Sequence, residues 1–236
     1  MKKLITLSML LMATTLFAQE TKSSSTLDLG MDVQSRYIWR GIQLGGNAAS
    51  AQPWVEFVTG DFTLGAWGAY NLGGTGTGNE ADFYVAYAFS DAFSVTVTDY
   101  FFPSEGNFNG YWPYSGHVLE GMLSFAGTDS FPIGISVATN FAGDADKKAN
   151  GKQAYSTYVQ LSYGTKIGET DFSITAGGVL NDDAGYYLTD GSGLINLSLG
   201  ASKEIKISDS FSLPVNGAIT FNPDSEDVFF TFGFSL

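Results

Sequence analysis

Residues 27–34 read Leu-Asp-Leu-Gly-Met-Asp-Val-Gln, and the next seven residues, 35–41, read Ser-Arg-Tyr-Ile-Trp-Arg-Gly. Apolar residues alternate with polar ones, which predicts a β-strand with one apolar and one charged face. If this strand runs over residues 26–39, Arg36 and Arg40 fall on its charged face. These are the only arginines in a 236-residue chain of formal charge -13. Charges inside and apolar side chains outside are what a transmembrane β-barrel requires.

The same period recurs along the chain after a series of short polar turns. A phenylalanine follows each turn, at residues 62, 93, 131, 172 and 211, and opens an alternating strand. Longer polar connections lie between these units, at about 42–51, 72–79, 103–115, 142–152, 181–191 and 222–227. We therefore predict an all-β fold, a transmembrane antiparallel up-and-down barrel of about twelve strands, at roughly residues 26–39, 52–59, 62–71, 80–90, 93–102, 116–126, 131–141, 153–163, 171–181, 192–203, 211–221 and 228–236.

The apolar faces of these strands are expected to meet lipid. Tyr70, Phe101, Phe141 and Phe221 follow the strand-opening phenylalanines after eight to ten residues. That separation is about 26 to 33 Å along a strand, or about 20 to 25 Å after a tilt near 40°, which suits two aromatic girdles. A soluble β-sandwich or lipocalin-like barrel also alternates, but its polar face would carry more Lys, Glu and Arg. Asp99 falls on the lipid face by strict alternation, which predicts an interfacial position or a bulge.

The first eighteen residues have the pattern of a secretory signal peptide. Lys2 and Lys3 precede an apolar run over residues 4–17, and Ala18 is a small residue at the expected cleavage point. We predict that residues 19–236 form a single barrel domain in a bacterial, Gram-negative outer membrane. The chain has no cysteine, which excludes a lipoprotein anchor and cysteine-based chemistry. After the signal, no run reaches the roughly 18 apolar residues of a transmembrane helix.

The charge and the last strand suggest partners. The acidic excess argues against nucleic acid, since phosphate binding needs clustered Lys and Arg. Residues 228–236 carry aromatics at alternating positions and end in Leu236, which is similar to the carboxy-terminal signal of outer-membrane proteins, whose usual last residue is Phe. We expect contact with outer-membrane lipid and with the barrel-assembly machinery. No motif calls for a cofactor or a metal.

Several motifs together resemble the TorF-like family of outer-membrane porins. They are residues 35–42 with the following Gln-Pro-Trp-Val-Glu at 52–56, then Glu-Ala-Asp-Phe-Tyr at 80–84, residues 100–106 and Glu120. The resemblance spans nearly the whole mature chain. It implies an outer-membrane barrel and a porin-like role, and it supplies no catalytic residues.

The candidate site lies on the predicted inner faces of the strands. Two arginines with five carboxylates could form a charged constriction that selects permeating solutes. The same groups could instead form a salt-bridge network that fills a narrow lumen. Five acids against two arginines predict a mild cation preference for small hydrophilic solutes or ions. The predicted pore-lining residues are Asp28, Asp32, Arg36, Arg40, Glu56, Asp82 and Glu120.

The long connections suggest further possibilities. Tyr111, Trp112 and Tyr114 could stack on a flat ligand at the mouth, although interfacial anchoring is the commoner role of such residues. Acidic residues in the connections, Asp146 and Asp182 among them, predict a solvated rim. His117 is the only histidine, and with nearby Ser115 it does not make a hydrolase motif. We expect a protein that is not an enzyme: a channel, or alternatively a non-conducting structural or surface-binding barrel.

Overall fold

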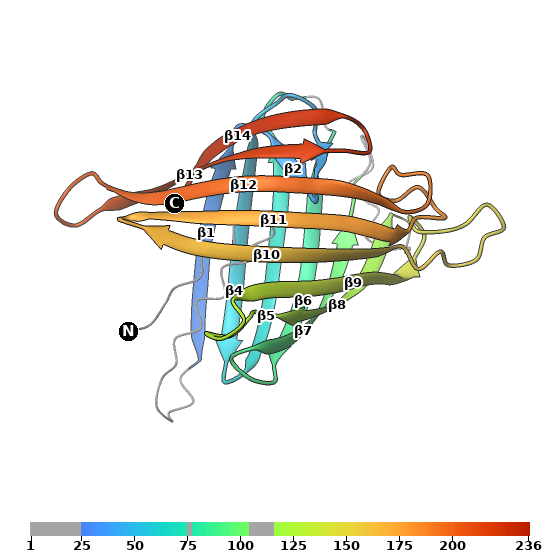
Figure 1. The fold of residues 1–236 in the computed structure, drawn as a ribbon, viewed down its shortest axis with the longest axis horizontal. Helices are drawn as coiled ribbons and strands as arrows, with labels where there is room; N and C mark the ends of the chain where they lie inside the picture. Colours follow the sequence, from blue (N-terminus) through green and yellow to red (C-terminus); the bar gives the residue numbers. More distant parts are fainter. Residues whose placement is uncertain (1–24, 75–76, 104–115) are drawn as a thin grey trace.

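The chain forms a closed, twelve-stranded antiparallel β-barrel (Figure 1). The computed structural model describes residues 25–74, 77–103 and 116–236. Every strand of the barrel pairs with its neighbours in sequence, and β1 closes the barrel by pairing with both β4 and β14. The barrel strands are β1 (Thr26–Gln34), β4 (Ser50–Thr59), β5 (Phe62–Asn71), β6 (Glu80–Ala88), β7 (Phe93–Phe101), β8 (His117–Phe125), β9 (Ile133–Gly143), β10 (Thr157–Ile167), β11 (Thr170–Asn181), β12 (Gly193–Lys206), β13 (Ser212–Asn222) and β14 (Asp227–Ser235).

The predicted fold class and the number of barrel strands are confirmed. The two ends of the barrel differ, since short turns join the strands at one end and longer connections join them at the other. We call these the short-turn end and the long-loop end. The predicted signal peptide lies outside the described residues. Among the residues that are described, no helix is long and apolar enough to span a membrane.

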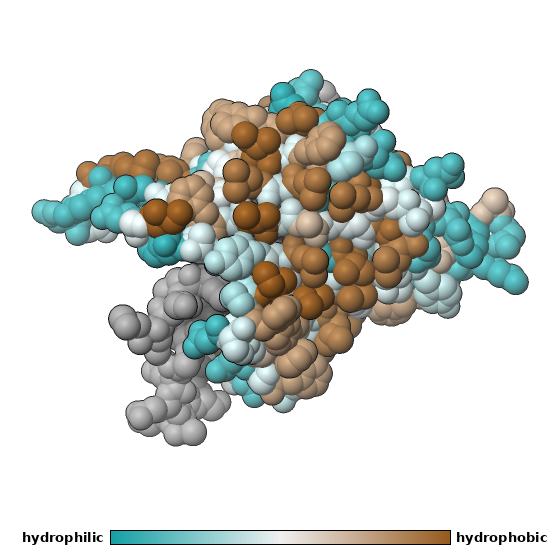
Figure 2. Space-filling model, viewed as in Figure 1, coloured by the Kyte–Doolittle hydropathy of each residue, from teal (hydrophilic) through white to brown (hydrophobic). Residues whose placement is uncertain are grey.

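Side chains on the outer wall are apolar, as the alternation predicts. Figure 2 shows apolar residues gathered around the middle of the barrel, with hydrophilic residues at both ends. Leu27 and Leu29 on β1 are 65% and 74% exposed, whereas Asp28 between them faces the lumen with Glu56, its partner on β4. Phenylalanines 62, 93, 131 and 211 are exposed near the short-turn end. Tyr70, Phe141 and Phe221 are exposed near the long-loop end, whereas Phe101, which was predicted with them, is only 9% exposed. Aromatic side chains thus lie near both ends of the outer wall, in two girdles of which the second lacks Phe101.

The first strand differs from its prediction. It ends at Gln34, and residues 37–44 form a separate two-stranded hairpin of β2 (Tyr37–Trp39) and β3 (Ile42–Leu44). The hairpin is buried against residues of the inner wall, including Tyr100, Val118 and Ile195. The connection predicted as an outer loop from residue 42 therefore begins inside the barrel. We call residues 37–44 the lumen hairpin.

Candidate functional site

The lumen hairpin turns at Arg40 and Gly41. Trp39 pairs with Ile42, so the turn has two residues, and both have positive φ, 49° at Arg40 and 85° at Gly41. This is the pattern of a type I′ turn, whose twist matches that of the flanking strands. A Cβ on Gly41 would lie 1.8 Å from the backbone oxygen of Ile195 on β12. The turn is thus pressed against the backbone of the opposite wall, which only glycine permits.

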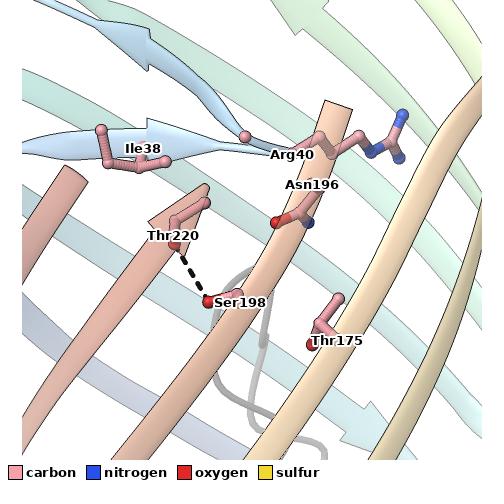
Figure 3. A pocket seen from close by; sticks show the side chains of 7 residues that line it. Ile38, Arg40, Thr175, Asn196, Ser198 and Thr220 are labelled. Atoms are coloured by element: carbon pink, nitrogen blue, oxygen red, sulfur yellow. Dashed lines mark hydrogen bonds between the residues drawn. The ribbon is translucent and has the colours of Figure 1, made fainter. Parts of the chain in front are cut away.

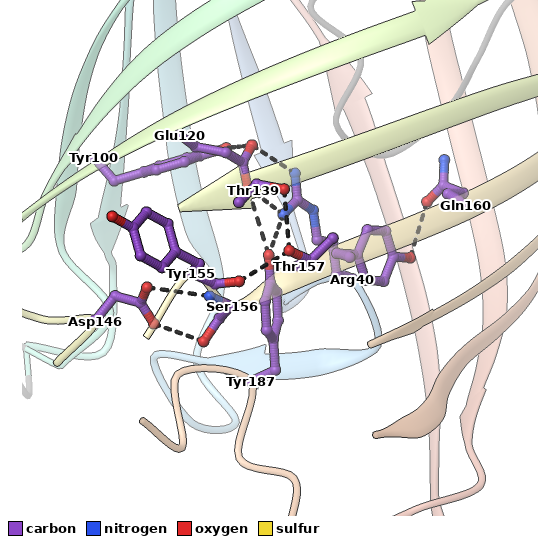
Figure 4. A network of polar contacts seen from close by, with 11 residues as sticks. Arg40, Tyr100, Glu120, Thr139, Asp146, Tyr155, Ser156, Thr157, Gln160 and Tyr187 are labelled. Carbon is purple, nitrogen blue, oxygen red and sulfur yellow. Dashed lines mark hydrogen bonds and ion pairs between the residues drawn. The ribbon is translucent and has the colours of Figure 1, made fainter. Parts of the chain in front are cut away.

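Arg40 joins the turn to β8 by an ion pair. Its guanidinium donates to both carboxylate oxygens of Glu120, with N–O distances of 2.5 and 2.8 Å, and also to the hydroxyl of Tyr187 at 2.6 Å (Figure 4). The Tyr100 hydroxyl donates to the same carboxylate at 3.1 Å. Arg40 and Glu120 are 7% and 1% exposed. The pair therefore has the two-pronged, fully hydrogen-bonded geometry that offsets the cost of burying charge.

Aromatic rings surround the same guanidinium. Its central carbon lies 4.6 Å from the ring centroid of Trp39 and 4.7 Å from that of Tyr158. Trp39 also stacks on Tyr187, with 5.4 Å between centroids and 6° between planes. Cation–π contacts of this kind favour arginine over lysine, because the planar guanidinium stacks while it keeps its hydrogen bonds.

Tyr187 is held in place by a carboxylate in the connection between β11 and β12. Asp182 accepts hydrogen bonds from the backbone N–H groups of Tyr187 and Thr189, at 2.9 and 3.2 Å. Ser156 donates to both Asp146 and Asp182, so the connection before β10 braces the one after β11. Burial raises the pKa of the Tyr187 hydroxyl, which keeps it a neutral partner for Arg40. The expectation of a solvated rim is wrong for Asp146 and Asp182, which are buried because backbone amides and hydroxyls satisfy them.

The predicted pore-lining carboxylates of β1, β4 and β6 face the lumen. Asp28 and Glu56 are directly opposite each other near the short-turn end, and the Tyr84 hydroxyl donates to Glu56 at 2.6 Å. Asp32 accepts a hydrogen bond from Ser235 at 2.5 Å, across the seam that closes the barrel. Asp82 is 3% exposed and lies farther toward the long-loop end.

Arg36 and Arg40 contact different residues and share no partner. Arg40 reaches Glu120 from the turn of the lumen hairpin, not from a barrel strand. Arg36 precedes the hairpin and donates to Gln43 on its other strand at 3.1 Å. The prediction that both lie on the charged face of one strand to residue 39 is wrong, because the chain leaves the barrel wall after Gln34. The predicted ligand contacts Tyr111, Trp112 and Tyr114 lie outside the described residues.

Several residues of this site were not singled out from the sequence. Trp39, Tyr158 and Tyr187 surround Arg40, and Asn222 donates to the backbone oxygen of Gly41 at 3.1 Å. An Arg-Gly pair between two short β-prone runs is a usable hairpin signal, since glycine at the second turn position favours type I′. No local signal marks Tyr158 or Tyr187, whose roles depend on partners far away in the chain.

Asp99 lies on the outer wall, as strict alternation predicts, and it has a partner there. The His117 Nδ1 is 2.8 Å from an Asp99 carboxylate oxygen, and the imidazole stacks on Phe101 with 4.6 Å between ring centroids. Asp99 is only two residues from the end of β7, at the long-loop end. The pairing explains how an acid is accommodated on an apolar wall without a bulge in β7.

Two small spaces adjoin the lumen hairpin. One, of about 10 Å³, has room for about one water molecule and is lined by Ile38 and Arg40 together with polar residues of the wall such as Asn196 and Ser198 (Figure 3). The other, of about 100 Å³, lies on the long-loop side of the hairpin. In the part of the chain that the structure describes, no group of three or more His, Asp or Glu side chains is arranged to hold a metal ion.

Comparison with solved structures finds the same architecture elsewhere. A structure titled "NanC porin structure in rhombohedral crystal form" matches with a TM-score of 0.52 and 10% sequence identity, over 88% of this chain and 98% of that chain. At this identity the likeness concerns the fold. A comparison with curated proteins found no match.

A family model matches residues 18–219, which include twelve of the fourteen strands in full. Its description is a bacterial protein of unknown function, abbreviated Gcw_chp. The narrower resemblance to the TorF-like porins stays a prediction. The chain belongs to the Gcw_chp family of bacterial proteins.

Proposed function

We propose that this protein is a porin-like channel of the bacterial outer membrane, which lets small hydrophilic solutes or ions diffuse passively. The contrast between its two walls carries the proposal. The outer wall is apolar between two aromatic girdles, while the inner wall presents hydroxyls, amides and carboxylates. Such a barrel suits lipid outside and water inside.

The charge of the lumen supports a mild cation preference. Arg40 and Glu120 neutralise each other, which leaves Arg36 against the inward carboxylates of Asp28, Asp32, Glu56 and the Glu80–Asp82 pair. A ring or cluster of carboxylates attracts cations and repels anions at a narrow passage. Carboxylates therefore outnumber arginines in the lumen even when the Arg40–Glu120 ion pair is left out of the count, which predicts a negatively charged lumen.

The alternative is a barrel that passes no current. The lumen hairpin crosses from β1 to contacts with β8, β12 and β13, through Glu120, Ile195 and Asn222. A segment joined to the opposite wall at three places could act as a permanent plug. In that case the function would lie in surface binding or in membrane structure, at the long-loop end. For neither function do we expect catalysis.

Single-channel current distinguishes the two. The refolded protein would be inserted into a planar bilayer under a tenfold KCl gradient. Discrete current steps with a reversal potential of the sign for potassium selectivity would support the channel and its acidic lumen. A folded, heat-modifiable barrel that gives no steps would reject the channel and favour the plugged barrel.

A further inference from the structure

The cavity of about 100 Å³ beside the lumen hairpin is lined mainly by apolar side chains, and its one charged lining residue is acidic. Six of its seven lining side chains are aromatic or aliphatic, and the seventh is a carboxylate; they are Trp39, Ile42, Leu44, Glu80, Phe102, Tyr186 and Leu188. All of them belong to the hairpin or to the long-loop end of the barrel. The cavity therefore lies toward the end of the barrel opposite the short turns.

The carboxylate at this cavity has no basic partner. Glu80 is 4% exposed and accepts a hydrogen bond from Tyr37 at 2.8 Å. Asp82 lies two residues farther along β6, on the same face of the strand as Glu80. Within the described residues, neither carboxylate forms a salt bridge. The buried arginine, Arg40, is paired with Glu120 instead.

Polar atoms of two lining residues also lack partners, as does one oxygen of Asp82, which does not line the cavity. The described contacts provide no hydrogen bond for the indole Nε1 of Trp39, the hydroxyl of Tyr186 or the Oδ1 of Asp82. Trp39 is only 6% exposed, so its N–H is held away from bulk solvent. A buried donor without an acceptor is costly, and a bound molecule with an oxygen acceptor would remove that cost.

From these observations we propose that the cavity binds a small organic ammonium ion that carries a hydroxyl group. The positive charge would balance the Glu80–Asp82 pair, and the rings of Trp39 and Tyr186 would face its methyl or methylene groups, as in other aromatic sites for ammonium ions. The hydroxyl would accept from the unpartnered N–H. This inference goes beyond the proposed function, since a barrel that conducts nothing could still bind the ion.

The size and the walls narrow the class of ligand. A cavity of about 150 Å³ holds benzene, which has six non-hydrogen atoms, so about 100 Å³ suits about four, the number in a trimethylammonium head. The hydroxyethyl arm of a larger ion such as choline would extend out of the cavity. A hard metal ion is a poor fit, because calcium and magnesium need about six or more oxygen ligands and these walls are mostly apolar. An anion would meet the charge of Glu80.

Choline and its neutral analogue 3,3-dimethylbutan-1-ol test the proposal, since they share shape and hydroxyl and differ only in charge. Binding to the refolded full chain in maltoside micelles would be measured by calorimetric titration. We expect choline to bind at least about tenfold more tightly than the alcohol. Equal affinities would overturn the proposal and leave an apolar cavity without a charge requirement. Glycerophosphocholine, titrated in the same way, distinguishes a free ion from a lipid headgroup as the ligand. We expect choline to bind and glycerophosphocholine not to bind; binding of glycerophosphocholine would contradict the assignment to a free ion and indicate a lipid headgroup.

Glu80→Gln removes the charge and keeps the shape of the side chain. We expect this variant to bind choline at least about tenfold more weakly, while Glu204→Gln, an exposed position near the short-turn end, binds as the unaltered protein does. Unchanged affinity in Glu80→Gln would also overturn the proposal. Heat modifiability on gels reports whether each variant is folded, and the comparison of choline with its analogue needs no variant. A protein that binds choline and passes no current would keep the site and reject only the channel.

Discussion

Arg40 and Glu120 lie 80 residues apart in the chain and form a two-pronged ion pair that joins the turn of the lumen hairpin to β8. Both side chains are buried, and Tyr100 and Tyr187 hydrogen-bond to the pair. A charge left alone at such a place would be far more costly than the intact pair. The pair is therefore the contact on which the position of the hairpin most depends.

Replacing Arg40 by alanine should lower the free energy of unfolding by about 3 to 5 kcal/mol, because Glu120 would stay buried without its partner. Urea titration of the refolded barrel measures this. Arg36→Ala is the matched control, since Arg36 is less buried and loses one hydrogen bond to Gln43, and it should change stability by less than about 1.5 kcal/mol.

The double variant Arg40→Ala/Glu120→Ala extends this test. It should recover part of the stability lost in Arg40→Ala, because no unpaired charge remains. If the hairpin narrows a working channel, both Arg40 variants should also show larger or noisier current steps. Stabilities that simply add would contradict the view that the two residues act as a pair.

Alanine variants of Gly41 and Gly46 distinguish two effects at the hairpin turn: its steric contact with β12 and the strain of a positive φ. Both have positive φ, 85° and 66°, but a Cβ on Gly41 would strike the Ile195 oxygen, whereas one on Gly46 would meet nothing within 4 Å. Gly46→Ala should cost about 1 to 2 kcal/mol, the usual cost of the left-handed region. Gly41→Ala should cost more and should unseat the hairpin, which limited proteolysis of the hairpin would detect. Equal costs would show that the turn does not press on β12.

The lumen carboxylates near the short-turn end should set ion preference. Asp28 and Glu56 face each other there, away from the hairpin, so Asp28→Asn/Glu56→Gln removes two charges at one level of the lumen. We expect the reversal potential under a salt gradient to move toward zero. Asp209→Asn is the control, since Asp209 is fully exposed in the turn between β12 and β13 and should leave the reversal potential unchanged. The opposite result would place the selective region elsewhere.

The barrel could be predicted from the sequence because its signal is local. Alternation with a period of two, from Leu27 to Gln34 and again in each later strand, needs no knowledge of the partner strand. The lumen hairpin could not be predicted in the same way, since Tyr37 and Trp39 continue the period of the first strand although the chain has already left the wall. The acidic partner of Arg40 is determined by the geometry of the barrel. Nothing in the sequence favours one of the five predicted lumen carboxylates over the others.

Asp99 and His117 provide the last test, on the outer wall. The His117 ring is 1% exposed and lies 2.8 Å from the Asp99 carboxylate, so His117→Ala would weaken the accommodation of an acid on an apolar surface. We expect a loss of about 1 to 3 kcal/mol in urea unfolding, the usual cost of removing one partner of a buried polar contact. Asp99→Ala/His117→Ala should recover part of this loss, because the acid is gone. If His117→Ala alone is neutral, Asp99 reaches interfacial water at the end of β7 without help from the histidine, and the pair is not what permits an acid on this wall.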